Sequence, residues 1–161
     1  MSLTAEEKAI IEKTWSLMSS NAKENSVDLF IRFFTENPSY QKMFKSFADV
    51  PMQELRGNKK IAAHAAQVVF AISALVQFID DTDCLVEQLD KIAERHQKRK
   101  VTPKMFENLG TSIVGWLIEK LGTDIMNEQA IEAWKKLYGV ILNVVTKHME
   151  EDNEDKTNSD K

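Results

Sequence analysis

Apolar residues recur at the three- and four-residue spacing of an α-helix along nearly the whole chain, and this periodicity restricts the fold more than any other feature. No segment of useful length alternates apolar and polar residues as a half-buried β-strand does. We therefore predict an all-α protein with six principal helices and one or two short ones. The principal helices are expected to begin at about residue 4, to span about 24–37, 57–80, 84–97 and 103–121, and to begin again after Asn127.

Capping residues and prolines set the ends of these helices. Thr4 and Glu7 form a capping box at the start of the first helix. Pro38 ends or redirects the second helix, because the residue before a proline avoids helical geometry. Pro103 suits the first turn of the fifth helix, and Gly122 stops that helix. These signals support a continuous series of helices.

The distribution of charge separates a neutral body from an acidic end. The net charge of −4 comes from residues 150–161, which hold six acidic and two basic side chains, whereas the rest of the chain is formally neutral. At 161 residues the chain is long enough for one domain with its own core. We predict a domain over residues 1–149 and a disordered, solubilising tail over 150–161. The neutral body predicts no nucleic-acid partner.

The N-terminus and the cysteine content indicate the compartment. "MSLTAEEKAI" lacks the basic head and apolar core of a secretory signal, and no apolar run approaches the roughly 20 residues that span a bilayer. Cys84 is the only cysteine, which excludes an internal disulfide and a cysteine-rich metal site. We expect a cytoplasmic protein without a membrane span, with a secreted protein whose signal has been removed as the alternative.

Two of the three histidines lie on apolar helix faces. At about 100° per residue, His64 lies inside the apolar sector of the 57–80 helix, and His96 lies in the middle of the buried stripe of the 84–97 helix. One such histidine is usually a core residue satisfied by a hydrogen bond. Two of them, with the basic run "QKRK" after His96, favour a shared ligand. His148 is interpreted as a cation at the end of the last helix.

Haem fits this pair of histidines better than zinc does. Structural zinc takes four tightly held ligands and catalytic zinc usually three, and the sequence shows no HxxxH pair or nearby acidic ligand to supply them. His148 could in principle be a third ligand, but it lies at the end of the last helix next to the acidic tail. Haem is flat and apolar and carries its own metal, so it requires an apolar slot, one axial nitrogen, a polar group opposite and cations at its rim. His96 is the candidate axial ligand and His64 the group opposite. Candidate walls are Val68, Phe30, Phe44, Val101, Phe106 and Tyr138, and candidate propionate partners are Arg95, Lys98, Arg99 and Lys100, which a solvated helix end would explain equally well.

Several motifs together resemble those of the globin family over roughly residues 3–149. "FIRFFTENPSYQKMF" resembles the passage from the second globin helix into the third, with Phe44 at the position of the phenylalanine that stacks on haem. "AAHAAQV" resembles the distal segment and "IAERHQKRKV" the proximal segment, which implies that His64 is the distal histidine and His96 the proximal iron ligand. "AWKKLYGVIL" is similar to the last helix of neuroglobin and of invertebrate nerve and tissue globins.

This resemblance implies the globin fold around haem b (iron protoporphyrin IX) and reversible binding of O2, with CO and NO as further ligands. It implies O2 storage or facilitated diffusion rather than an enzymatic role. Two states of the unliganded iron remain open, one with His64 bound directly, which is hexacoordinate, and one without. A nitric oxide dioxygenase or nitrite reductase served by a separate reductase is a second candidate function, and a redox or gas sensor is a third. Patterns of residues do not predict the oligomeric state.

Overall fold

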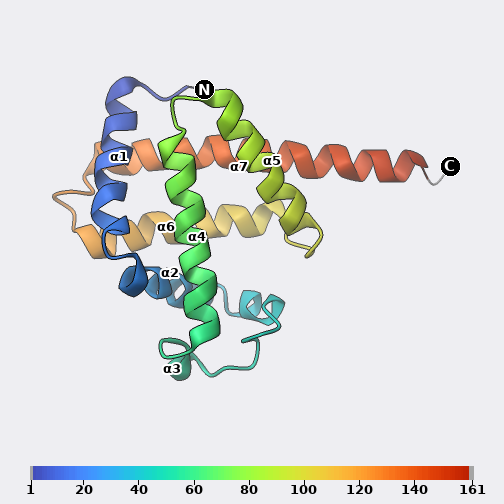
Figure 1. The fold of residues 1–161 in the computed structure, drawn as a ribbon, viewed down its shortest axis with the longest axis horizontal. Coiled ribbons are helices and arrows are strands. Elements are labelled where there is room, and N and C mark those ends of the chain that lie inside the picture. Colours follow the sequence, from blue (N-terminus) through green and yellow to red (C-terminus); the bar gives the residue numbers. More distant parts are fainter. Residues whose placement is uncertain (1, 160–161) are drawn as a thin grey trace.

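Eight helices and no strand make up residues 2–159, the part of the chain that the computed structural model describes (Figure 1). Six long helices, with two short ones between the second and third of them, confirm the all-α prediction. In chain order they are α1 (Ala5–Ser19), α2 (Ala22–Glu36), the 3-10 helix η1 (Pro38–Met43), α3 (Met52–Leu55), α4 (Lys59–Gln77), α5 (Thr82–Gln97), α6 (Pro103–Leu121) and α7 (Glu128–Ser159).

Side-chain caps define most of the helix starts. The Thr4 hydroxyl accepts a hydrogen bond from the Glu7 amide at 3.1 Å, and the Glu7 carboxylate accepts one from the Thr4 amide at 2.7 Å, which confirms the capping box. Asn58 caps α4, which begins later than predicted, and Asp81 caps α5, which begins earlier. Asn127 caps α7, as predicted. The ends of the helices are thus fixed mainly by short-range chemistry.

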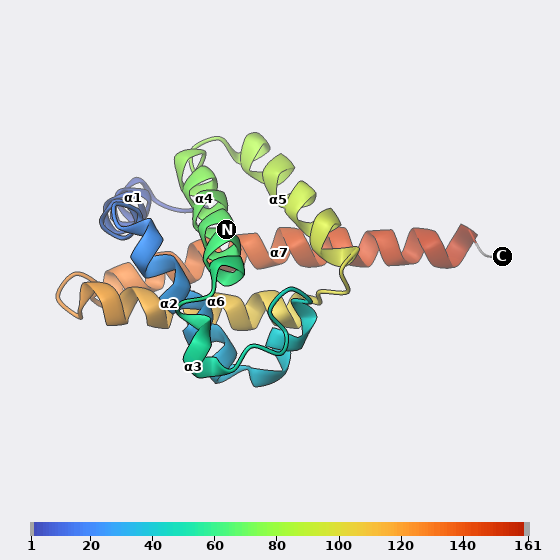
Figure 2. The ribbon, with the colours of Figure 1, turned by 60° about the horizontal axis from the view of Figure 1, so that its bottom comes forward.

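The long helices cross in two layers. Figures 1 and 2 show α6 and α7 running antiparallel to each other, with α1, α4 and α5 crossing them. The main helix contacts join α2 to α4 and α6, α1 to α4 and α7, α6 to α7, and α5 to α7. The helix α4 is therefore held by α1 and α2, whereas α5 is held by α7.

Three tryptophans join five of these helices in the core. The Trp15 ring lies 6.2 Å from that of Trp116 and 5.8 Å from that of Trp134, measured between ring centroids. Each indole N–H has an acceptor: Trp15 donates to the hydroxyl of Ser73, Trp134 to that of Thr14, and Trp116 to a backbone carbonyl of α2. The cluster buries large apolar rings without leaving an N–H group unpaired, which fixes α1 against α4, α6 and α7.

The acidic C-terminal segment is helical, which differs from the disordered tail predicted for residues 150–161. The helix α7 continues through Ser159, and Figure 1 shows it extending beyond the other helices. Neither glycine nor proline interrupts the segment, and ion pairs one turn apart join Lys147 to Glu151 at 3.8 Å and Asp152 to Lys156 at 2.5 Å. His148 therefore lies inside a helix, and its interpretation as a helix-terminal cation is wrong. Residues 160 and 161 of the predicted tail lie outside the described part.

Length and composition alone would allow α4 to cross a membrane, although the sequence predicted no such span. It is the one helix within residues 2–159 that meets this criterion. In the fold it packs against α2 and α1 and contributes Ile61, Ala65 and Val69 to the buried core. Packing in the core of the helical domain therefore accounts for the apolar composition of α4.

Two glycines give a matched test of this packing. A methyl group at Gly110 in α6 would meet the ring of Tyr138 at 2.3 Å, whereas a methyl group at Gly139 in α7 would meet nothing within 4 Å. We expect Gly110→Ala to lower the free energy of unfolding by about 1–3 kcal/mol, because the tyrosine ring must move. Gly139→Ala should raise it by about 0.5–1 kcal/mol, because alanine is the better helix former. Urea-induced unfolding measures both; equal effects of the two changes would contradict this packing.

Candidate functional site

The two predicted haem-facing histidines lie on helices that follow one another in the chain but diverge in space. His64 is in α4 and His96 is in α5, and Figures 1 and 2 show these helices separating from the loop that joins them. Neither helix makes an extensive contact with the other, because α4 packs against α1 and α2 and α5 packs against α7. Helix packing therefore does not close the space between the two histidine-bearing faces.

The imidazole of His96 is held in one orientation by its own helix. Its Nδ1 lies 2.7 Å from the carbonyl oxygen of Ile92, one turn earlier. Because a carbonyl only accepts hydrogen bonds, Nδ1 must carry the proton, and Nε2 keeps an unshared electron pair. The ring of Phe106 meets the imidazole edge to face, with the ring centroids 5.1 Å apart. A neutral imidazole with an accessible Nε2 is the form that binds a metal.

The backbone that follows His96 is also fixed. Val101 donates its amide hydrogen to the carbonyl of His96 at 3.1 Å, and Lys100 donates to the carbonyl of Gln97 at 2.9 Å. These two bonds form a Schellman motif, which requires a left-handed residue near its end. Lys100 supplies that residue with a φ of 62°, a conformation that usually favours glycine. The end of α5 is thus a closed unit of backbone hydrogen bonds.

Aromatic rings surround the imidazole of His64. The ring centroids of Phe30 and Phe44 lie 5.0 Å and 4.9 Å from the imidazole centroid, both edge to face, and Phe47 lies at 6.2 Å. Phe44 and Phe47 stack on each other at 5.1 Å. Neither ring nitrogen of His64 has a hydrogen-bond partner among residues 2–159. This imidazole is therefore held by apolar contacts and keeps both nitrogens available to a ligand.

Electrostatics keep both imidazoles neutral at pH 7. Burial lowers the pKa of His64 to about 4, and the neighbouring basic groups of His96 and Arg99 make smaller contributions in the same direction. Burial also lowers the pKa of His96, and Arg99 and Arg95 add to this effect, whereas the hydrogen bond to the Ile92 carbonyl opposes it.

The other predicted wall residues lie around these two rings at different depths. Val68 and Val101 are half-buried and pack against the core. Tyr138 supports the site from behind, since its hydroxyl donates to the carbonyl of Phe106 at 2.8 Å. Burial raises the pKa of the Tyr138 phenol, so the group stays protonated and remains a donor. Phe30 and Phe44 contact His64, and Phe106 contacts His96, as described above.

Two parts of the site were not predicted from the sequence. Phe47 is 3 % exposed and stacks on Phe44, and its spacing of three residues from Phe44 was the only available signal. The carbonyl of Ile92 was not identified, because a backbone acceptor leaves no mark in the residue types. Of the predicted propionate partners, Lys98 pairs with Glu94 at 2.7 Å, whereas Arg99 acts electrostatically on both histidines.

These residues fit haem on the chemistry of their donor atoms. No cluster of three or more His, Cys, Asp or Glu side chains that could hold a metal ion occurs in the described range. Two histidines alone would leave most coordination positions of a metal ion unfilled, whereas haem brings four nitrogen ligands of its own. A neutral His96 Nε2 on one side, an unpartnered His64 on the other and phenylalanine rings between the helices meet the remaining requirements of haem.

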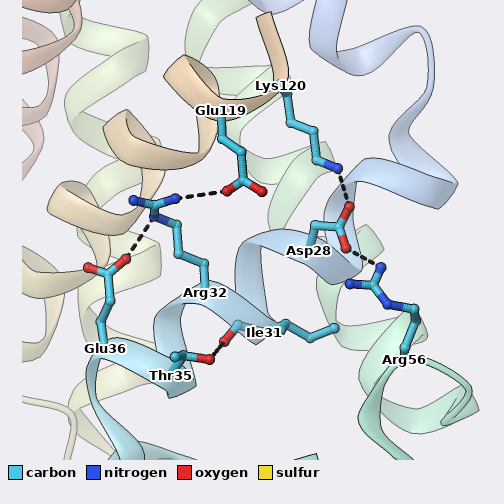
Figure 3. Close-up of a pocket in the computed structure, with 8 residues that line it drawn as sticks. All are labelled: Asp28, Ile31, Arg32, Thr35, Glu36, Arg56, Glu119 and Lys120. Atoms are coloured by element: carbon cyan, nitrogen blue, oxygen red, sulfur yellow. Dashed lines mark hydrogen bonds and ion pairs between the residues drawn. The ribbon is translucent and has the colours of Figure 1, made fainter. Parts of the chain in front are cut away.

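A separate pocket of about 570 Å³ lies over α2, α6 and the end of α3 (Figure 3). Its charges compensate one another: Asp28 pairs with Arg56 and Lys120, and Arg32 pairs with Glu36 and Glu119. None of the predicted site residues lines it. Its lining consists of Asp28, Ile31, Arg32, Thr35, Glu36, Arg56, Glu119 and Lys120.

An all-α fold that carries one neutral imidazole on each of two diverging helices, each packed against phenylalanine rings, is compatible with a haem protein. The globin family model matches residues 27–145, so the chain belongs to the globin family. This membership assigns it to the haem proteins that bind diatomic gases and that generally act as non-enzymatic oxygen binders.

Individual relatives are similar to this chain in sequence or structure over most of its length. A globin of Nerita albicilla is 27% identical over 144 residues, covering 89% of this chain and 91% of the relative. Cytoglobin-1 of Danio rerio is 28% identical over 142 residues, covering 87% of this chain and 82% of the relative. The solved structure of a Drosophila melanogaster globin superposes with a TM-score of 0.82 at 26% identity, covering 90% of this chain and 94% of that one. The likeness therefore extends over the whole helical domain.

The ion pairs of Asp28 generate a prediction about stability and pH. Burial opposes ionisation of Asp28, but hydrogen bonds from Lys120 and Arg56 outweigh it and hold the pKa of the carboxyl below its ordinary value of 3.8. The resulting stabilisation is complete above that ordinary value and is lost as the pH falls through the lower folded-state pKa. At pH 7 we expect Asp28→Asn to lower the free energy of unfolding by about 1 kcal/mol. Urea unfolding at a series of pH values should show this difference shrinking in acid; a constant difference would contradict the assignment.

Proposed function

We propose that this globin holds haem b between α4 and α5, with His96 as the proximal iron ligand and His64 on the distal side, and that it binds O2 reversibly. CO and NO are ligands of the same site in this proposal. One observation carries it: the hydrogen bond from His96 Nδ1 to the Ile92 carbonyl leaves Nε2 available, while His64 has no partner across the site. The physiological role proposed is O2 storage or facilitated diffusion.

On the proximal side, the hydrogen bond of His96 does more than select the tautomer. Donation from Nδ1 to the 2.7 Å distant carbonyl increases the basicity of Nε2 and fixes the plane of the ring. Phe106 limits rotation of that ring from the α6 side. Val101 extends the proximal wall, and Arg99 offers a cation near the rim.

On the distal side, the protein supplies a polar group in an apolar surrounding. The bound ferrous haem supplies the site at which O2 binds. His64 can donate a ring N–H to the gas, and the phenylalanine rings around it strengthen that hydrogen bond by excluding water. Phe30, which is 2 % exposed, also narrows the space available above the haem plane. Val68 completes the distal wall one turn after His64.

The unpartnered imidazole of His64 is compatible with two states of the gas-free protein. In one, His64 binds the iron directly, so that O2 must compete with it and the apparent affinity falls by the fraction of open protein. In the other, the sixth position is open. Differences of about an ångström in the distance between His64 and the iron decide between them.

The proposal places the protein in the cytoplasm and gives it no enzymatic role. The single cysteine, Cys84, has a free thiol, which suits a reducing compartment. Turnover of nitric oxide or nitrite would require a separate reductase, because every cycle consumes electrons. Sustained turnover with a purified cellular reductase would contradict the non-enzymatic role.

The proximal assignment predicts the behaviour of His96→Ala. We expect this variant to lose the wild-type visible spectrum of the haem-loaded protein and to bind haem more weakly, because it lacks the axial nitrogen. External imidazole should restore the spectrum by entering the space left by the side chain. His148→Ala is the matched control for the loss of a histidine: His148 contacts Asp90 and not the haem-facing residues, so this variant should keep haem ligated through His96. An unchanged spectrum and unchanged haem affinity in His96→Ala would overturn the assignment.

The distal assignment predicts faster release of O2 from His64→Leu. Loss of the donor should increase the O2 dissociation rate constant about tenfold, the effect of one well-placed hydrogen bond. His64→Gln is the control, because its amide keeps a donor, and it should stay closer to the wild type. The spectrum of the gas-free ferrous protein, compared between wild type and His64→Leu, then distinguishes the two states of His64. Equal dissociation rates in all three proteins would refute the distal role.

A further inference from the structure

The helix that carries His96 depends on one neighbour for its position. Within residues 2–159, α5 makes its extensive contacts with α7, and these contacts include apolar side chains of both helices in the core. Two polar contacts lie beside them. Nδ1 of His148 lies 3.1 Å from a carboxylate oxygen of Asp90, in the middle of α5. The second polar contact lies at the end of α5, next to His96.

Gln97 makes this second contact with two residues of α7. Its side-chain amide donates to the backbone carbonyl of Met149 at 3.2 Å and to the side-chain oxygen of Asn153 at 3.3 Å. One donor group thus reaches two successive turns of α7. Both distances lie near the long end of the ordinary hydrogen-bond range.

The position of Asn153 explains how the contact arises. Ile141, Val145 and Met149 form a buried stripe along α7 at intervals of four residues. Asn153 comes four residues after Met149, so it lies on the same face one turn later. The apolar stripe therefore ends in a polar residue, and Gln97 meets that residue. The first turn of the C-terminal extension belongs to the contact with α5 rather than to solvent alone.

We propose that Gln97, held by Met149 and Asn153, is a positioning residue for the imidazole of His96. The residues 96–101 form a closed set of backbone hydrogen bonds, so a constraint on Gln97 also constrains its neighbour His96. The extension of α7 then sets where the last turn of α5, and with it the imidazole of His96, lies relative to the rest of the site. The inference rests on the proposed role of His96 as the proximal ligand.

The test uses the full chain and three single variants. Asn153→Ala removes the side-chain acceptor, and Gln97→Leu removes the donor while keeping similar bulk. Asn158→Ala is the matched control, because Asn158 lies on the same extension, is exposed and has no partner within the described residues. All three positions are at least partly exposed, so the variants are expected to fold.

Two measurements separate a structural contact from a positioning role. Amide hydrogen exchange in the last turn of α5 should become about fivefold faster in Asn153→Ala and Gln97→Leu, as expected for the loss of one hydrogen bond, and should stay unchanged in Asn158→Ala. In the haem-loaded ferrous protein, the iron–histidine stretching band recorded just after photodissociation of CO should shift in the same two variants alone.

Faster exchange without a shift of the band would show a merely structural contact and would overturn the proposal. Unchanged exchange in both variants would overturn it as well. Failure of the proposed function is detected separately by His96→Ala. If that variant keeps normal haem ligation, the positioning role falls with the proximal assignment, whereas the hydrogen-exchange result still reports on the contact between α5 and α7.

Discussion

The hydrogen bond between Nδ1 of His96 and the carbonyl of Ile92 is the interaction on which the site depends. It lies within one helix, so any conformation that preserves α5 also preserves the tautomer and the ring plane. The helix itself cannot set where that ring lies in the molecule. Its position comes from α7, and the Schellman motif after His96 makes the end of α5 stiff enough to follow α7. The tautomer and ring plane of His96 are thus set within α5, whereas the position of the imidazole in the molecule is set by the packing of α5 against α7.

The distal side follows a different principle, because His64 has no polar partner that fixes its ring. Phe30, Phe44 and Phe47 come from α2 and from the segment after it, and they surround the imidazole with edges and faces of apolar rings. Such contacts hold a position without binding a particular nitrogen, so both ring nitrogens stay available. The two histidines are therefore held differently: a directional hydrogen bond orients His96, whereas packing against phenylalanine rings holds His64.

Local patterns in the sequence were sufficient for the helices, their caps and both inward histidines. The capping box at Thr4 and the apolar faces of α4 and α5 are properties of short segments, which explains why they could be predicted. Membership of the globin family is confirmed as well. The helical end of the chain was missed although local signals for it exist, since the segment lacks glycine and proline and has charges of opposite sign one turn apart. Its contact with α5 through Asn153 could not be predicted, because the partner Gln97 lies far away in the sequence. The same holds for the Ile92 carbonyl, since backbone acceptors are common to all residues.

The extension of α7 also changes the hydrodynamic shape of the molecule. Beyond the turn that contacts α5, residues 154–159 continue the helix away from the body of the protein (Figure 1). At the rise of an α-helix, this arm measures about 9 Å. An arm of that length makes rotation slower about the short axes than about the long one, so the protein tumbles anisotropically in solution. The acidic side chains of the extension also give that end of the domain a local negative charge.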